Sequence, residues 1–100
     1  MNLTDNDILI IKDLCSHHKV SKLFVIGSVL TDRFNKDSDI DFVVNFANVP
    51  LYEYANNYFT LKNSLEALFK REIDLLEDQA LDVNPYLRHS IDSSKQLIYG

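Results

Sequence analysis

A glycine-serine pair followed by two closely spaced carboxylates restricts this chain more than any other feature. The stretch 27–41, GSVLTDRFNKDSDID, begins with Gly27, the only glycine in the sequence besides the C-terminal Gly100. Before it, residues 22–26 form a short apolar run, typical of a buried strand that ends where the backbone turns or approaches a ligand closely. We therefore predict a strand ending at Gly27 and a turn opened by Ser28.

The residues after this turn predict a second strand with two carboxylates on one side. In residues 39–44, DIDFVV, positions i and i+2 point to the same face of a strand. Asp39 and Asp41 therefore share a face, while Ile40 and Phe42 pack behind them. Such a pair is also compatible with a solvent-facing position on a half-exposed strand, but its proximity to the glycine-serine pair favours a ligand site.

A hard divalent cation would resolve the repulsion within this carboxylate pair, which is costly to bury without one. Mg²⁺ prefers oxygen ligands and is usually held by one or two carboxylates together with substrate phosphates. The formal charge of −5 argues against unspecific nucleic-acid binding, where a basic face supplies most of the affinity. We expect the chain to meet a polyphosphate through a metal, without direct nucleic-acid binding.

The spacing of these motifs resembles a known signature. Gly27-Ser28, followed after ten residues by the Asp-Ile-Asp of 39–41, is similar to the motif of the DNA polymerase β-like nucleotidyltransferase superfamily. More narrowly, it resembles the minimal nucleotidyltransferases (MNT type) of bacteria and archaea. A later predicted strand, 72–76 (EIDLL), stands where that family places its third carboxylate.

This resemblance implies roles for five residues. Asp39 and Asp41 would bind two Mg²⁺ ions, and Asp74 would complete the catalytic site as base or co-ligand. Gly27 and Ser28 would bind the triphosphate of ATP through backbone N–H groups and a hydroxyl. The implied reaction is transfer of a nucleoside monophosphate, with the metal ions polarising the α-phosphate and stabilising the departing pyrophosphate.

The chain departs from the family pattern directly after the glycine-serine pair. Family members commonly continue with a small residue, an arginine and a glycine, whereas this chain has Leu30, Thr31 and Asp32. The positive group expected near the phosphates is therefore missing. Arg33 and Lys36 are candidates to replace it from the same segment.

Three functions remain open at this point. The resemblance implies an antitoxin that transfers AMP from ATP to a hydroxyl of a helical HEPN-type toxin, and an acidic chain suits a basic partner of that kind. The second is a catalytically inactive module that binds a nucleotide or the toxin. The third is a small-molecule transferase of the antibiotic-modifying type, although those enzymes use a further domain to hold the acceptor.

The rest of the chain predicts a small α/β (α+β) protein forming one domain over residues 1–100. We expect the polymerase β-like fold, a small mixed sheet with helices packed on it, in the order α-β-turn-β-α-β-α-β. Besides the strands above, periodicity and capping signals predict four elements: a helix from Thr4 to about Lys19 capped by Thr4 or Asp5, a long helix after Pro50 from Leu51 to Lys70, a helix from Asn84-Pro85 to about Ile91, and an edge strand over 96–99.

Other chemistry-bearing residues have structural interpretations that we prefer. Cys15 lies in a helical pattern and is expected in the core, and its lack of a partner cysteine fits a reducing compartment. His17 and His18 diverge on a helix and are expected at its end rather than at a metal. A core role is preferred over base stacking for Tyr52, Tyr54, Tyr58 and Phe59, and a surface role over phosphate binding for Arg88, His89 and Lys95.

The sequence gives no indication of a membrane protein. No apolar run approaches the roughly 20 residues of a membrane span, and the N-terminus, MNLTDNDILI, lacks the basic start of a signal peptide. We therefore expect a cytoplasmic location.

Overall fold

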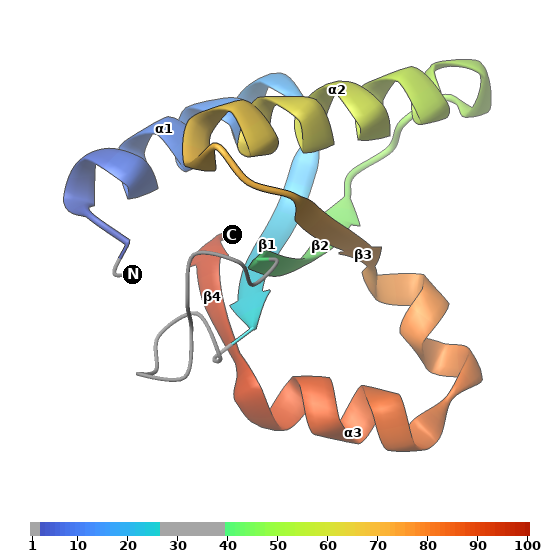
Figure 1. Ribbon diagram of the computed structural model, residues 1–100. Helices are drawn as coiled ribbons and strands as arrows, with labels where there is room; N and C mark the ends of the chain where they lie inside the picture. Colours follow the sequence, from blue (N-terminus) through green and yellow to red (C-terminus); the bar gives the residue numbers. More distant parts are fainter. Residues whose placement is uncertain (1–2, 27–39) are drawn as a thin grey trace.

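The structure, a computed structural model, describes residues 3–26 and 40–100 (Figure 1). Its elements follow the predicted order, with one added 3₁₀ helix, η2. Helix α3 extends beyond the predicted end at Ile91. The elements are α1 (Asp5–His17), β1 (Val20–Ile26), β2 (Ile40–Phe46), α2 (Leu51–Phe69), β3 (Ile73–Glu77), η2 (Asp78–Val83), α3 (Pro85–Ser94) and β4 (Lys95–Tyr99).

The four strands form one mixed sheet in the order β3-β2-β1-β4. Strands β2 and β3 are parallel, whereas β1 pairs antiparallel with both β2 and β4. A parallel pair needs a long crossover connection, and α2 provides it. The predicted edge strand is confirmed as β4, and the predicted position of β3 beside β2 is confirmed by the sheet order.

Helix α1 forms where the capping signals predict. The Thr4 hydroxyl accepts a hydrogen bond from the Asp7 N–H (3.0 Å), and the Asp7 carboxylate accepts one from the Thr4 N–H (3.1 Å). This reciprocal pair satisfies donors that a helix start otherwise leaves exposed. One turn apart, Ile11 and Cys15 are both fully buried, and burial raises the pKa of the Cys15 thiol to about 12. Cys15 is therefore a core residue, as predicted.

The main core lies between the sheet and the two long helices, on what we call the α1/α2 face. Alternate residues of each strand point toward it, as strand geometry requires. Figure 1 shows α1 and α2 crossing this side of the sheet together. The buried residues of this cluster are Ile11, Cys15, Val20, Leu23, Val25, Ile40, Phe42, Val44, Leu61, Leu65, Phe69, Ile73 and Leu75.

The predicted apolar stripe of α2 is confirmed in its second half and wrong at its start. Of the residues in this stripe, Leu61, Leu65 and Phe69 are buried, but Leu51 is 92% exposed. The first turn of α2 lies beyond the strands (Figure 1), so no sheet covers it. Pro50 occupies the N-cap position, one residue before the first helical residue.

The opposite side of the sheet, which we call the η2/α3 face, has a thinner cover. Its cluster contains three buried residues, Val43, Leu81 and Ile91, with Phe24, Ile26 and Leu76 partly buried around them.

Helix α3 begins as predicted at Asn84, whose side chain accepts hydrogen bonds from the N–H groups of the second and third helical residues (both 3.1 Å).

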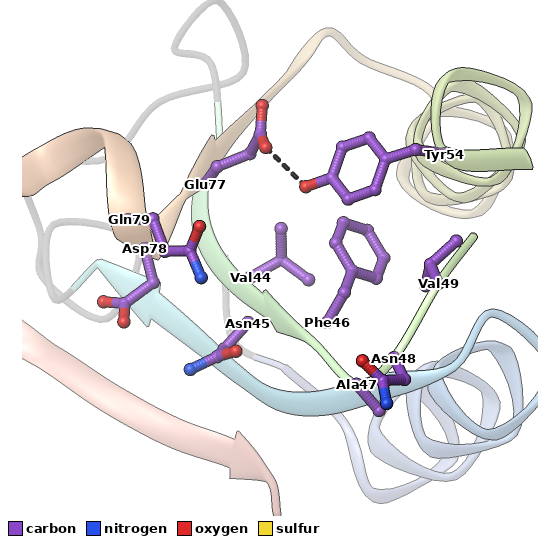
Figure 2. Close-up of a pocket in the computed structure, with 10 residues that line it drawn as sticks. All are labelled: Val44, Asn45, Phe46, Ala47, Asn48, Val49, Tyr54, Glu77, Asp78 and Gln79. Carbon is purple, nitrogen blue, oxygen red and sulfur yellow. Dashed lines mark hydrogen bonds between the residues drawn. The ribbon is translucent and has the colours of Figure 1, made fainter. Parts of the chain in front are cut away.

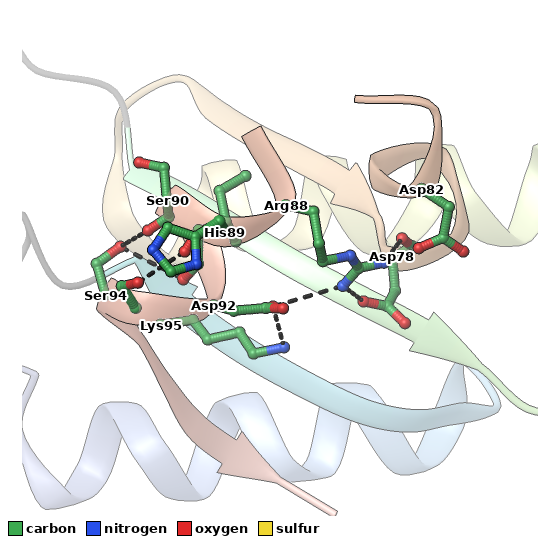
Figure 3. A network of polar contacts seen from close by, with 10 residues as sticks. Asp78, Asp82, Arg88, His89, Ser90, Asp92, Ser94 and Lys95 are labelled. Carbon is green, nitrogen blue, oxygen red and sulfur yellow. Dashed lines mark hydrogen bonds and ion pairs between the residues drawn. The ribbon is translucent and has the colours of Figure 1, made fainter. Parts of the chain in front are cut away.

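Ion pairs join the two elements of this cover (Figure 3). The guanidinium of Arg88 on α3 contacts the carboxylates of Asp78 and Asp82 at 2.8 and 2.7 Å, and that of Asp92 at 3.5 Å. It also donates to the backbone oxygen of Asp78 (2.6 Å). Arg88 therefore links α3 to η2, which agrees with the preferred structural interpretation of this residue.

The described part of the chain includes no helix that is both long and apolar enough to cross a membrane.

Candidate functional site

Two predicted site residues meet on neighbouring strands. Asp41 is the second residue of β2 and Asp74 the second of β3, and the parallel ladder pairs them directly. Paired residues point to the same face, with strands about 4.8 Å apart. The residues flanking each aspartate are buried on the α1/α2 face, at 0 to 4% exposure. Asp41 and Asp74 therefore share the η2/α3 face.

Both aspartates lie at the end of the sheet where the chain leaves β1. Strand β1 runs antiparallel to β2, with Val25 opposite Phe42, so Ile26 comes to the same end as Asp41. The Ile40 N–H donates to the Glu72 oxygen (3.3 Å), which fixes the start of the parallel pair. The remaining predicted site residues, Gly27, Ser28 and Asp39, lie outside the described residues.

The paired carboxylates fit a hard cation. Asp74 is exposed and Asp41 half-buried, and two oxygen donors on adjacent strands suit the ligand preference of Mg²⁺. Within residues 3–26 and 40–100 no group of three or more histidine, cysteine, aspartate and glutamate side chains could hold a metal ion. That range includes two of the three predicted ligands, because Asp39 falls outside it.

Helix α2 holds the strand that carries Asp74. The Tyr58 hydroxyl donates to the Leu75 backbone oxygen (2.6 Å), and the Glu66 carboxylate accepts from the Ile73 N–H (3.4 Å). Asp74 thus lies between two tethered residues of an edge strand that would otherwise present unpaired backbone groups. One local signal could have indicated these contacts, namely the polar groups of Tyr58 and Glu66 beside the apolar residues of α2.

A third tether joins the Tyr54 hydroxyl to the Glu77 carboxylate at the far end of β3. Burial, followed by this hydrogen bond, raises the pKa of Tyr54 to about 12. The pKa of Tyr58 is also raised, by burial and by the charges of Glu77 and Asp74. Both phenols therefore remain protonated donors at neutral pH.

The predicted core role of the four aromatic residues of α2 is only partly correct. Tyr54 and Tyr58 are half-buried, with hydroxyls that bind β3, but Tyr52 is 87% and Phe59 57% exposed. Periodicity identified the apolar residues of the helix. It did not show that Tyr52 and Phe59 lie on the solvent-exposed side of the helix.

Two basic residues of the predicted set lie near the η2/α3 face. Arg88 is bound to three aspartates, as described above. Lys95, the first residue of β4, pairs with Ile26, and its ammonium lies 2.8 Å from the Asp92 carboxylate and 4.2 Å from the centre of the Phe24 ring. The hydrogen bond from Lys95 lowers the pKa of Asp92.

Two clefts in the described part lie away from the paired aspartates. A cavity of about 280 Å³ opens at the carboxyl ends of β2 and β3, the opposite end of the sheet (Figure 2). We give more weight to the carboxylate pair than to this cavity, because the cavity is bordered by acids that already have partners. Its lining is Val44, Asn45, Phe46, Ala47, Asn48, Val49, Tyr54, Glu77, Asp78 and Gln79.

A second hollow, of about 440 Å³, lies beside the end of α1 and the start of α2. Its two histidines follow the predicted helix-end arrangement. The Nδ1 atom of His17 contacts the Asp13 backbone oxygen (2.8 Å), and that of His18 contacts the Leu14 oxygen (2.7 Å). Each ring thus binds a terminal carbonyl of α1, which supports the preference for a structural pair over a metal site.

Comparisons of the sequence with known proteins agree with this geometry. The family model described as "Polymerase beta, Nucleotidyltransferase" matches residues 10–100. Two Methanocaldococcus jannaschii proteins are similar. "Putative protein adenylyltransferase MJ0128" is 33% identical over 88% of this chain and 84% of that protein. "Putative protein adenylyltransferase MJ1379" is 31% identical, with the same two shares.

Solved structures share the fold. One, described as "Structure of putative minimal nucleotidyltransferase", has a TM-score of 0.74 and 25% identity, covering 91% of this chain and 88% of that one. Another, "Crystal structure of the toxin-antitoxin with AMP-PNP", has a TM-score of 0.68 over 97% of this chain and 74% of that one. Its identity of 17% supports a common fold alone.

Proposed function

The chain belongs to the polymerase β nucleotidyltransferase family, and on that basis we propose that it transfers AMP from ATP to a hydroxyl group of a partner protein. The observation that carries the proposal is the in-register pairing of Asp41 and Asp74 on one face of the sheet. The two relatives named as adenylyltransferases of proteins support the choice of donor and of acceptor class.

Asp41, together with Asp39, is proposed to hold Mg²⁺, and Gly27 and Ser28 to bind the triphosphate. When bound, the metal withdraws charge from the phosphate under attack and from the leaving group. The exposed carboxylate of Asp74 accepts the proton of the acceptor hydroxyl. The hydroxyl oxygen forms a bond to the α-phosphorus as the bond to pyrophosphate breaks, so that AMP is transferred and pyrophosphate leaves.

The surroundings of Asp74 suit a base that must stay in one place. Its strand is anchored by buried neighbours on one face and by Tyr58 and Glu66 at the edge. A general base contributes only when it lies within hydrogen-bonding reach of the proton that it removes. The tethers on either side of Asp74 therefore limit how far its carboxylate drifts from the acceptor.

For the partner we propose a helical HEPN-type toxin, so that this chain acts as its antitoxin. Solved structures that share this fold are described as toxin–antitoxin structures, which supports a toxin as the partner. The acidic balance of the chain, with a formal charge of −5, favours association with a basic protein.

The experiment is a transfer assay with ATP labelled on the α-phosphate, Mg²⁺ and the product of the adjacent gene. Label on the partner that disappears with Asp41→Asn supports the proposal. Asp5→Asn, at an exposed acid of α1, is the matched control, and the partner should still be labelled with this variant. A tight complex without label indicates an inactive binding module. Absence of both label and complex contradicts the proposed partner.

The two aspartates should separate binding from turnover. We expect Asp41→Asn to remove metal-dependent ATP binding, measured by calorimetry. Asp74→Asn should lower the transfer rate by about 10²- to 10⁴-fold, the usual contribution of a general base, with ATP affinity nearly unchanged. Both variants should fold, because each removes like-charge repulsion at constant volume. Parental turnover in Asp74→Asn would shift the role to Glu72 or Glu77.

A further inference from the structure

A lysine occupies the same cross-strand row as the aspartate pair. Asp41 pairs with Asp74 on β3, and Ile26 pairs with Lys95 on β4. The antiparallel ladder of β1 and β2 places Ile26 next to Asp41 at the end of the sheet. The row of paired backbone positions therefore runs across all four strands, with two aspartates at one side, an apolar residue in the middle and a lysine at the other side.

The Lys95 side chain lies on the face that carries the carboxylates. Its Nζ atom is 4.2 Å from the centre of the Phe24 ring, and Phe24 packs with Val43 in the cluster of the η2/α3 face. Lys95 and Asp41 are separated by two strand spacings, roughly 10 Å between their backbones. The backbone of Lys95 is thus two strands from that of Asp41, while its ammonium lies inward of the row, over Phe24.

A triphosphate brings several negative charges to a sheet end that already has two carboxylates. Like charges there raise each other's free energy unless cations lie beside the phosphates. Arg88 is unsuited to this task, because its guanidinium already contacts three aspartates (Figure 3). The ammonium of Lys95 has three N–H donors, and within residues 3–26 and 40–100 it pairs with one carboxylate, that of Asp92, at 2.8 Å.

We propose that Lys95 binds the β- and γ-phosphates of the nucleotide, so that this residue selects a nucleoside triphosphate over a monophosphate. The inference rests on the proposed function and assigns a residue of β4 to its substrate. In the structure the carboxylate of Asp92, three residues earlier on α3, holds the Lys95 ammonium at 2.8 Å, over the ring of Phe24. The long side chain of Lys95 would turn its ammonium from this position toward the phosphates when the nucleotide binds.

The test is calorimetric titration with ATP and, separately, AMP, each with Mg²⁺. Lys95→Met keeps a long apolar side chain beside Phe24 and removes the charge. It should weaken ATP binding by ten- to a hundredfold, as expected for loss of a charge-assisted hydrogen bond, and change AMP binding less than about twofold. Lys95→Arg should restore most of the affinity for ATP. The matched control is Lys22→Met, an exposed lysine on the same face at the opposite end of β1.

Three results would overturn the assignment. The first is parental ATP affinity in Lys95→Met while Asp41→Asn abolishes binding, which would leave the proposed function standing. The second is an equal loss of ATP and AMP affinity, which would indicate a structural role. The third is selective loss of ATP affinity in Arg71→Gln, two residues before β3, with none in Lys95→Met. If the parent binds no ATP in the presence of Mg²⁺, both the inference and the proposed function fail.

Discussion

The two faces of the sheet are built differently. Among the described residues, thirteen buried side chains form the cluster on the α1/α2 face, whereas the cluster on the η2/α3 face has three. The second face is held largely by ion pairs around Arg88. It is also the face that carries Asp41 and Asp74. The comparison indicates that one side of the sheet supplies most of the stability and that the other side carries the two aspartates of the proposed site.

This division has a physical reason. Burying apolar surface stabilises a fold in proportion to area, so a face packed by two long helices dominates the free energy of unfolding. Substrates must reach polar groups, and a thin cover leaves those groups accessible. Regions with few buried apolar contacts also open locally at lower free energy than the rest of a protein. The four predictions that follow test this contrast, from the largest expected effect to the smallest.

The largest effect should come from emptying the main core. Phe42 is fully buried, with its ring centre 6.1 Å from that of Phe69. Phe42→Ala should lower the free energy of unfolding by about 3–5 kcal/mol, and Ile91→Ala on the other face by about 2 kcal/mol, measured by urea denaturation. A larger loss in Ile91→Ala would contradict the assignment of stability to the α1/α2 face.

The ion pairs should contribute less and respond to salt. Arg88→Met should lower Tm by a few degrees in dilute buffer, because Asp78 and its neighbours lose their shared cation. Molar NaCl should shrink the difference between parent and variant, since the contacts are partly exposed. Lys62→Met, which breaks a pair with Glu66 on α2, is the control and should change little. Salt-independent loss would mean that packing, not charge, joins α3 to η2.

The tether between Tyr54 and Glu77 should appear as a dependence of stability on alkaline pH. The folded-state pKa of Tyr54 is raised from 10.0 to about 12, so the folded protein keeps this proton where the unfolded chain loses it. Stability from this group is complete below pH 10 and is lost as the pH rises toward about 12. Tyr54→Phe should flatten the fall of Tm over this range. An unchanged profile would show that the hydroxyl titrates normally.

The smallest of the four effects should be a gain in the free energy of unfolding. Lys70, which ends α2, has φ 55° and ψ 42°, the left-handed conformation that side chains disfavour and glycine accepts. Lys70→Gly should raise the free energy of unfolding by about 0.5–1 kcal/mol by urea denaturation. Lys70→Ala retains the penalty and should give no such gain. A loss in the glycine variant would indicate that the lysine side chain stabilises the helix end.

The sequence predicted the elements of the fold because their signals are local. Thr4 and Asn84 cap the helices that they were expected to cap. Alternation in 39–44 predicted which side chains of β2 enter the core. The exposure of Leu51 was missed, because periodicity shows which residues share a helix side but not how far the sheet extends beneath it.

The candidate site was predictable only in part. The strand positions of Asp41 and Asp74 followed from motif and alternation, and the sheet pairs them. The row that includes Lys95 could not be predicted, because it depends on the register of β4 against β1, and that register shifts between Leu23 and Phe24. Irregular pairing of this kind has no signature in the residues themselves.

The parallel pairing of β2 and β3 also has a kinetic consequence. Strands β2 and β3 meet only after the chain has passed through all of α2, and contacts between residues distant in sequence form late because loop closure costs entropy first. Partly folded chains would therefore contain α2 as a nascent helix before Asp41 and Asp74 come together. Metal affinity would then arise only after β2 and β3 have paired, and it would distinguish chains with this pair from earlier intermediates during refolding.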